Sequence, residues 1–279
     1  MKKLTIHDLH QKKIEKRPIT MLTAYDYPSA KMVAEAGIDI ILIGDSLAMT
    51  MLGHKSTVSV TMDEMLHHCK AVSRGAPDTF LIGDMPFLSY QTSIPEAIQN
   101  AGRFIKEAQM DAIKLEGGEA VTGTIKALVN ASIPVMGHIG LTPQSITKLS
   151  GYHVQGKKAA DARRLLNDAL ALQDAGCFAI VLEALPAPVA KTISEKLEIP
   201  TIGIGAGPGC DGQVLVFHDI LGLYDQFVPK YVKQYAQLWP QIVSAIQNYR
   251  DDVESGAYPD ETHSYPMDAK ELDEFESGK

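Results

Sequence analysis

Residues 159–182 read AADARRLLNDALALQDAGCFAIVL and contain the repeating unit that decides the fold. Leucine and alanine recur at helical spacing as far as Ala175, and Gly176 stands where the C-terminal end of a helix favours glycine. The apolar run Phe178–Leu182 then has the near-continuous hydrophobicity of a strand that is covered on both faces. A helix followed directly by a buried strand is typical of an α/β fold with a parallel sheet.

Short apolar runs of the same kind recur along the whole chain between helical stretches. A (β/α)8 barrel takes about 250 residues, and this chain has 279. Eight strand–helix units therefore predict an α/β fold of the TIM-barrel type, with an open doubly wound sheet as the alternative. The predicted strands are Ile19–Thr23, Ile38–Ile43, Phe80–Gly83, Ala112–Leu115, Pro134–Gly137, Phe178–Leu182, Thr201–Ile204 and Gln213–Phe217.

Capping boxes mark the starts of three predicted helices. Thr61-Met-Asp-Glu64 precedes a helix that runs through Ala71, and Ser93-Ile-Pro-Glu96 precedes another. The earliest box, Thr5-Ile-His-Asp8, predicts a short helix before the first strand. In a barrel such a helix can close the N-terminal mouth, so we expect an N-terminal capping helix.

The end of the chain predicts a C-terminal helical extension of the barrel. A mostly helical pattern runs from Val228 to about Tyr249. The Trp239-Pro240 pair interrupts this pattern, and proline inside a helix removes a hydrogen bond, so we expect a kink there.

The charge distribution separates a short tail from the rest of the chain. Residues 251–279 contain ten acidic and two basic side chains, which accounts for the net charge of −8, so residues 1–250 are neutral overall. No segment rich in Gly, Pro or Ser divides two cores. We therefore predict one domain over residues 1–260 and an acidic, flexible tail over residues 261–279.

The composition excludes several classes of protein. Hydrophobic residues make up 45% of the chain, enough for a full core, and no window approaches the ~18 unbroken apolar residues of a membrane span. The charged N-terminus has no apolar segment typical of a secretory signal. Three cysteines without a CxxC pair indicate neither a disulfide framework nor a zinc ribbon. No basic stripe is present, so we expect a cytoplasmic protein that binds neither nucleic acid nor membrane.

Three acidic side chains follow consecutive predicted strands. Asp45, Asp84 and Glu116 stand where strands two, three and four end. Neighbouring strands lie about 5 Å apart, so these carboxylates would converge and repel unless a cation offset them. Magnesium prefers such oxygen ligands. Taken singly, Asp45 or Ser46 is more often a helix cap and Asp84 a turn residue; their appearance together favours a metal site.

Two further strands end in groups that can bind or transfer a proton. Lys114 lies two residues before Glu116 and points to the same side, either as a neutralising ion pair or as a ligand of a substrate carboxylate. Glu183 follows a strongly apolar strand and suits a general base, although a surface carboxylate is equally common there. His138 could donate a hydrogen bond to a developing oxyanion, but a lone histidine is more often a satisfied core residue.

Other short motifs carry weaker signals. His67 and His68 are adjacent on a helix and point in different directions, so they cannot form a zinc site together. The glycines in Gly203-Ile-Gly-Ala-Gly207 lack the Lys-Ser/Thr ending of a phosphate loop. Close approach of backbones at the barrel mouth is enough to explain them.

Several ordered segments, spread from Thr5 to Asp260, resemble the ketopantoate hydroxymethyltransferase family. The segments are Gly44-Asp-Ser-Leu-Ala-Met49, Leu52-Gly-His-Lys-Ser-Thr57, Lys114-Leu-Glu-Gly-Gly118, Gly137-His-Ile-Gly-Leu-Thr-Pro-Gln-Ser145, Gly151-Tyr-His-Val-Gln-Gly-Lys157, Gly203-Ile-Gly-Ala-Gly207 and Cys210-Asp-Gly-Gln-Val-Leu-Val216. The resemblance implies transfer of a hydroxymethyl group from methylene-tetrahydrofolate to 3-methyl-2-oxobutanoate, giving ketopantoate on the route to pantothenate. It also implies a homo-oligomer, a decamer in this family, with the helices after Val228 as contact elements.

The resemblance assigns roles to the same strand-end residues. Asp45, Asp84 and Glu116 match the positions of one magnesium ion per subunit. Asp45, Ser46, Asp84 and Lys114 match keto-acid contacts, Glu183 matches the proton acceptor, and His138 matches a polar position of the site. Three residues depart from the family pattern, Ala48, Lys55 and Ser59; they affect the loop after the second strand and folate affinity rather than the metal site.

The expected mechanism follows from this assignment. Magnesium would act as a Lewis acid and stabilise the enolate that forms when the C3 proton leaves the keto acid. Folate would carry the one-carbon chemistry, and residues 151–157 would form a lid. A magnesium-dependent carbon–carbon lyase or mutase that acts on a related keto acid is the alternative enzyme, and a non-catalytic binding protein is the alternative from another class.

Overall fold

Eight parallel strands close into a barrel, in the order β1 to β8 around its axis. The computed structural model describes residues 3–149 and 151–278. The strands are β1 Ile19–Thr23, β2 Ile40–Ile43, β3 Phe80–Asp84, β4 Ala112–Glu116, β5 Val135–Gly140, β6 Ala179–Glu183, β7 Thr201–Ile204 and β8 Gly212–Leu215. All eight predicted strands are confirmed, and β8 pairs with β1 to close the ring. Closure excludes the open sheet.

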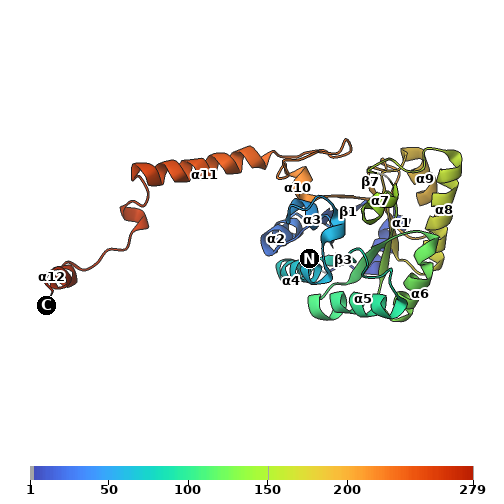
Figure 1. Ribbon diagram of the computed structural model, residues 1–279, viewed down its shortest axis with the longest axis horizontal. Helices are drawn as coiled ribbons and strands as arrows, with labels where there is room; N and C mark the ends of the chain where they lie inside the picture. The colour runs from blue at the N-terminus through green and yellow to red at the C-terminus, as the bar shows by residue number, and fades with distance from the viewer. Residues whose placement is uncertain (1–2, 150, 279) are drawn as a thin grey trace.

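Helices surround the strands and follow them in alternation (Figure 1). The principal helices are α2 Tyr27–Glu35, α4 Met62–Gly75, α5 Ile94–Ala108, α6 Thr122–Asn130, α8 Ala159–Asp174 and α9 Ala187–Lys196, with the short helices α3 Leu47–Thr50, α7 Ile146–Leu149 and α10 Phe217–Ile220. Short 3-10 turns are η1 Thr57–Ser59, η2 Glu119–Val121 and η3 Pro143–Ser145. Only the four residues of α10 follow β8 directly, where a full barrel helix stands after most other strands.

Two of the three predicted capping boxes form completely in the structure. Thr5 and Thr61 each form the complete predicted capping box, with Asp8 and Glu64 as partners. Ser93 accepts a hydrogen bond from the backbone N–H of Glu96, but the Glu96 carboxylate bonds to the Thr92 hydroxyl instead of returning to Ser93. The third box is therefore only half formed, because a nearer hydroxyl competes for the carboxylate.

Helix α1, Ile6–Ile14, covers the amino ends of the strands as predicted. Leu9 is buried in the apolar cluster that fills the barrel interior, together with Ile19 and Ile40 from the first residues of two strands. Lys12 and Lys13 of the same helix form ion pairs with Asp39 and Asp211, which precede β2 and β8. The core thus closes this end of the barrel and leaves the other end for polar residues.

The C-terminal extension differs from its prediction. Helix α11, Leu238–Ser255, begins one residue before Trp239, so Pro240 lies in its first turn and produces no kink. Residues 228–237, all described, contain no helix. Figure 1 shows α11 and α12 (Ala269–Ser277) reaching away from the barrel.

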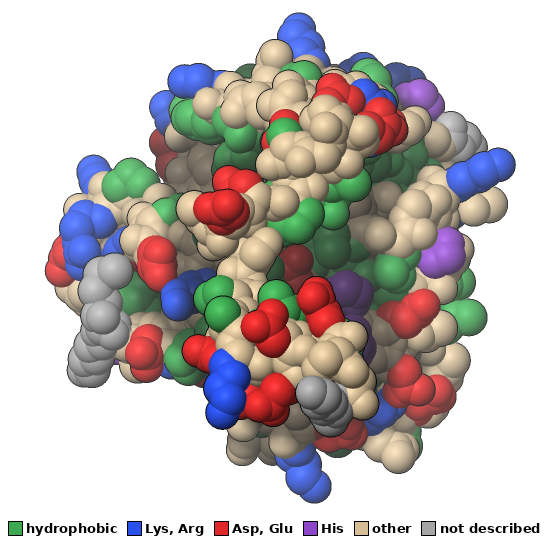
Figure 2. All heavy atoms as spheres, turned by 90° about the vertical axis from the view of Figure 1, so that its left-hand side faces the viewer, with side chains coloured by type: hydrophobic (Ala, Val, Ile, Leu, Met, Phe, Trp, Pro, Cys, Tyr) green, Lys and Arg blue, Asp and Glu red, His purple; other side chains and the backbone are tan. Residues whose placement is uncertain are grey.

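The extension is exposed along its length. Helix α11 has no buried residue in the described chain. Figure 2 views the molecule from the side of this arm and shows hydrophobic and acidic side chains next to one another on the surface. No helix in the described residues is long and apolar enough to cross a membrane.

Candidate active site

The predicted polar residues lie together at the carboxyl end of the barrel. Parallel strands bring their C-terminal residues to one face, and β2 to β6 are consecutive neighbours in the ring. Most of these side chains are buried, which is unusual for ionisable groups and indicates a site rather than a surface. The buried members are Asp45, Asp84, Lys114, Glu116 and His138.

Asp45 and Asp84 are in direct contact. The backbone N–H of Asp45 donates to Asp84 Oδ2 over 3.1 Å. Burial, followed by repulsion from Asp84 and Glu116, raises the pKa of Asp45 well above its usual value. Burial also raises the pKa of Asp84, although Lys114 opposes the effect. Two adjacent carboxylates with raised pKa values are a site that a cation would stabilise.

In the structure the Ser46 side chain does not cap a helix, and the Asp84 side chain does not bond to its own turn. Ser46 stands at the start of α3 without a side-chain capping bond. Its hydroxyl instead lies 2.8 Å from that of Tyr25. Asp84 accepts bonds from Asp45, which follows β2, and from Lys114 in β4, rather than from its own turn.

Lys114 pairs with Asp84, not with Glu116. Its ammonium donates to Asp84 Oδ1 over 2.6 Å, and both side chains are almost completely buried. Burial opposes the charged form, but the surrounding carboxylates outweigh it and raise the pKa of Lys114. A neutralising pair with Glu116 was one of the two alternatives for Lys114, and the structure has a pair between β4 and β3 in its place. The charged ammonium lies in a site that can bind an anion.

Gln144 connects the acidic residues and was not predicted as a site residue. Its amide Nε2 donates to Asp45 Oδ2 and to the backbone carbonyl of Met85. Its backbone N–H donates to Glu116 Oε2 over 3.1 Å. Tyr90 completes this network by donating to Gln144 Oε1. Gln144 lies in one of the segments that resemble the family, one residue before its end at Ser145, and this is the only signal that could have identified it.

His138 lies between two carboxylates. Its Nδ1 is 3.5 Å from Glu116 Oε1 and its Nε2 is 3.2 Å from Glu183 Oε2. These contacts are ion pairs and not hydrogen bonds: among the described residues neither ring nitrogen nor Glu116 Oε1 has a hydrogen-bond partner. Burial and Lys114 lower the pKa of His138, but Glu116 and Glu183 outweigh them and raise it to about 9. His138 is therefore not a core histidine whose ring nitrogens are hydrogen-bonded, which was the alternative interpretation of this residue.

The three carboxylates do not form one ready set of ligands. Among residues 3–149 and 151–278, no three Asp, Glu, His or Cys side chains are grouped so that they could hold a metal ion. Lys114 occupies one oxygen of Asp84, and Gln144 occupies one oxygen each of Asp45 and Glu116. Asp84 Oδ2 also accepts the N–H of Asp45. Asp45 Oδ1, the second lone pair of Asp84 Oδ2 and the nearby Glu116 Oε1, which is unbonded among the described residues, still fit a hard divalent cation, since magnesium often uses only one or two carboxylates.

The segment predicted as a lid lies against the site. The backbone N–H of Gln155 donates to the carbonyl of Ala184, next to Glu183. The Tyr152 hydroxyl is 4.0 Å from the sulfur of Met49 in α3. Burial, followed by the charges of Asp45 and Glu183, raises the pKa of Tyr152. The segment therefore contacts both the β2 side and the β6 side of the mouth.

The glycine-rich segment after β7 permits close packing, as expected. A side chain at Gly205 would lie 2.7 Å from the ring of Tyr231. A Cβ atom at Gly207 would overlap the Cβ of Ala187. These glycines leave room for neighbouring groups at the mouth.

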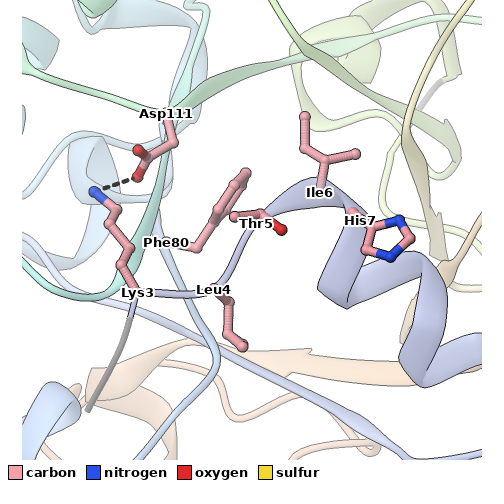
Figure 3. Close-up of a pocket in the computed structure, with 7 residues that line it drawn as sticks. All are labelled: Lys3, Leu4, Thr5, Ile6, His7, Phe80 and Asp111. Atoms are coloured by element: carbon pink, nitrogen blue, oxygen red, sulfur yellow. Dashed lines mark ion pairs between the residues drawn. The ribbon is translucent and has the colours of Figure 1, made fainter.

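A cavity of about 480 Å³ lies at the other end of the barrel (Figure 3). Its lining includes Thr5, Phe80 and Asp111, which stand before or at the first residues of their elements. Catalytic residues of such barrels lie at the carboxyl ends of the strands. This cavity is therefore separate from the cluster around Asp45.

Solved structures of several enzymes have a similar fold. One is a phosphonopyruvate hydrolase in complex with oxalate and Mg²⁺, with a TM-score of 0.62 and 14% identity over 100% of this chain and 96% of that one. Another is 2,3-dimethylmalate lyase, a member of the PEP mutase/isocitrate lyase superfamily, with a TM-score of 0.60 and 14% identity over 98% and 95%. At this identity the likeness confirms the barrel alone.

Sequence relatives identify the activity class. The chain is 57% identical over 263 residues to the 3-methyl-2-oxobutanoate hydroxymethyltransferase of Moorella thermoacetica, covering 94% of this chain and 98% of the relative. It is 55% identical over 267 residues to the enzyme of that name from Heliobacterium modesticaldum, covering 96% and 97%. The model of the family described as ketopantoate hydroxymethyltransferase matches residues 3–261. The predicted one-carbon transferase is thus confirmed, and the chain belongs to the ketopantoate hydroxymethyltransferase family.

Proposed function

We propose that this chain transfers a hydroxymethyl group from methylene-tetrahydrofolate to C3 of 3-methyl-2-oxobutanoate, giving 2-dehydropantoate. The observation that carries the proposal is the line of charged groups from the buried Lys114 and Asp84 through Glu116 and His138 to the partly buried Glu183. This line supports a site in which Lys114 binds the substrate carboxylate and Glu183 accepts the substrate proton.

Magnesium is the proposed cation, held by Asp45 and Asp84 with Glu116 nearby. When bound, it would polarise the keto oxygen of the substrate. The hard oxygen donors, the raised pKa values of both aspartates and the unbonded Glu116 oxygen support this assignment. The oxalate and Mg²⁺ of the phosphonopyruvate hydrolase structure are consistent with a small dicarbonyl ligand on this fold.

The side chains of the site divide the work of binding and proton transfer. Lys114 attracts the carboxylate of the keto acid, and the Ser46 hydroxyl, oriented by Tyr25, lies beside Asp45 to contact it. Glu183 removes the C3 proton. His138, which faces Glu183, orients that carboxylate and balances its charge. The resulting carbanion attacks the methylene carbon of the folate in its N5-iminium form, which forms the new C–C bond and returns the iminium electron pair to N5. Water then replaces N5 on that carbon: its oxygen becomes the hydroxyl of the product, its proton goes to N5, and tetrahydrofolate leaves.

The segment Gly151–Lys157 is proposed as the lid that excludes water after both substrates bind. Its contacts on two sides of the mouth, through Gln155 and Tyr152, support this role. Exclusion of water strengthens the electrostatic interactions inside the site and protects the carbanion.

Product formation tests the proposal and separates it from a lyase. The purified chain would be incubated with 3-methyl-2-oxobutanoate, MgCl2 and ¹³C-methylene-tetrahydrofolate, and the product followed by mass spectrometry. We expect 2-dehydropantoate with one labelled carbon, and none without folate. Folate-independent cleavage of the keto acid would overturn the proposal in favour of the lyase.

We also propose that the chain assembles with copies of itself through α11. Its exposed apolar side chains include Trp239, Ile242, Ile246 and Val253, which recur at helical spacing. Sedimentation of the intact chain, compared with a variant that carries Ile246→Glu, tests this. A monomer at working concentration would exclude the assembly.

A further inference from the structure

Asp219 is an acidic side chain without a partner at the same end of the barrel. It lies in α10, directly after β8, so it belongs to the carboxyl face that carries the site. The side chain is half-buried, and it makes no hydrogen bond or ion pair with another described residue. A partly desolvated carboxylate without donors is costly, and a structure that retains one leaves two acceptor oxygens for a ligand.

Asp219 lies near residues of both parts of the proposed site, the keto-acid contacts and the proposed base. Its charge acts on the hydroxyl of Tyr25, which contacts Ser46 beside the predicted metal ligands. Its charge and that of Glu183 both act on the hydroxyl of Tyr231. Asp219 therefore lies within electrostatic range of residues that adjoin both the keto-acid contacts and the proposed base.

Two aromatic rings, those of Tyr231 and His218, lie near the Asp219 carboxylate. The Tyr231 ring lies against Gly205 at the end of β7 and is 40% exposed. The His218 ring stacks on Tyr25 at a centroid distance of 5.5 Å. His218 Nδ1 is buried and has no hydrogen-bond partner among the described residues. Flat rings, one unpaired nitrogen and one unpaired carboxylate together suit a planar heterocycle with hydrogen-bond donors on its edge.

We propose that Asp219 binds the pterin ring of the folate co-substrate, with its two carboxylate oxygens accepting from the ring N3–H and the 2-amino group. This inference rests on the proposed function, because only a folate-dependent reaction brings a pterin to the site. The two donors are adjacent on one edge of the ring, and they match a carboxylate as the fork of an arginine does. Tyr231 provides the neighbouring aromatic face.

The position also suits the reaction. N3 and the 2-amino group belong to the pyrimidine ring of the pterin, whereas N5, which holds the one-carbon unit, belongs to the second ring. A ring held at Asp219 can therefore extend toward the space between Glu183 and the keto-acid contacts. Proximity of this kind contributes to rate by orienting the two substrates.

Binding of tetrahydrofolate to the full chain tests the proposal. Isothermal titration would compare the unsubstituted protein with Asp219→Asn, and with Asp225→Asn as a matched control on an exposed aspartate. Two bonds to a charged acceptor predict a loss of affinity of about 10- to 100-fold for Asp219→Asn and no loss for the control. Equal affinity in all three proteins would overturn the proposal.

A second ligand shows which part of folate is recognised. A tetrahydrofolate analogue in which a methyl group replaces the 2-amino group should bind the unsubstituted protein about 10-fold more weakly, and this penalty should vanish in Asp219→Asn. An analogue penalty of the same size in both proteins would show that Asp219 does not contact the amino group, and would contradict the proposal.

Failure of this inference and failure of the proposed function give different results. Exchange of the C3 proton of 3-methyl-2-oxobutanoate in heavy water needs no folate. Absence of exchange in the unsubstituted protein would overturn the proposed function, whereas undiminished tetrahydrofolate binding by Asp219→Asn overturns only the role of Asp219. A parallel loss of exchange and folate affinity in Asp219→Asn would indicate general damage to the site and would also contradict the proposal.

Discussion

The imidazole of His138 lies 3.2 Å from the carboxylate of Glu183. The other ring nitrogen faces Glu116 at 3.5 Å, so one side chain links the predicted base to the acidic cluster around Asp45 and Asp84. Removing His138 therefore alters the surroundings of Glu116 and Glu183 at once.

Replacement of His138 by leucine should destabilise the protein. The change leaves Glu116 and Glu183 facing each other without a cation between them, and removing one member of a buried charged group costs about 3 kcal/mol. Urea unfolding measures the loss. His67→Leu, on the exposed side of α4, is the control and should change stability by less than about 0.5 kcal/mol. Equal stability of the two variants would show that the pairing contributes nothing.

Replacing Lys114 alone by methionine should destabilise the protein more than replacing Lys114 and Asp84 together. The single change strands a buried carboxylate and costs about 3–5 kcal/mol, whereas Lys114→Met combined with Asp84→Asn removes both charges and should recover part of the loss. Thermal unfolding of the two variants, with Lys106→Met on an exposed helix face as control, checks this. A double variant no more stable than the single one would contradict the pairing.

Replacement of Gln144 by leucine should lower the free energy of unfolding by about 1–3 kcal/mol. The amide group of Gln144 serves Asp45, Tyr90 and the Met85 carbonyl, and leucine leaves these buried groups unsatisfied. Chemical denaturation gives the value, and Gln99→Leu on the exposed face of α5 is the matched control. A change no larger than that of the control would mean that the network is dispensable.

Asp219→Asn should raise the melting temperature at pH 8. Burial without a partner raises the pKa of Asp219 to about 6, above that of the unfolded chain. The folded state therefore favours the protonated acid, the destabilisation grows as pH rises from about 4 to 6, and it is complete above that range. Melting curves between pH 5 and pH 8 should show the benefit of the substitution shrink toward the acid end. A benefit independent of pH would contradict this account.

The fold, and the place of most candidate site residues at the strand ends, could be predicted from local patterns. Each strand of the barrel is a short apolar run, and a residue such as Asp84 or Glu183 stands out because it is charged at the end of one. Gln144 and Tyr90 could not be found in this way, because their importance comes from hydrogen bonds between elements far apart in the sequence. The absence of a ready three-carboxylate ligand set is equally a tertiary effect, since Gln144 and Lys114 already bond to those oxygens.

The course of the C-terminal segment was not predictable for a related reason. Pro240 is compatible with the first turn of a helix as well as with a kink, and only the start of α11 at Leu238 decides between them. Asp219 likewise has no distinctive neighbours in sequence. Its lack of partners is visible only when the surrounding elements are in place.

Exchange of the C3 proton of 3-methyl-2-oxobutanoate tests the central claim most directly. NMR would follow the signal in heavy water with magnesium and without folate, for the unsubstituted chain and for Glu183→Gln. We expect exchange well above the buffer rate in the first and a loss of about 10²-fold or more in the second. Exchange at the buffer rate in the unsubstituted chain, or undiminished exchange after Glu183→Gln, would contradict the account.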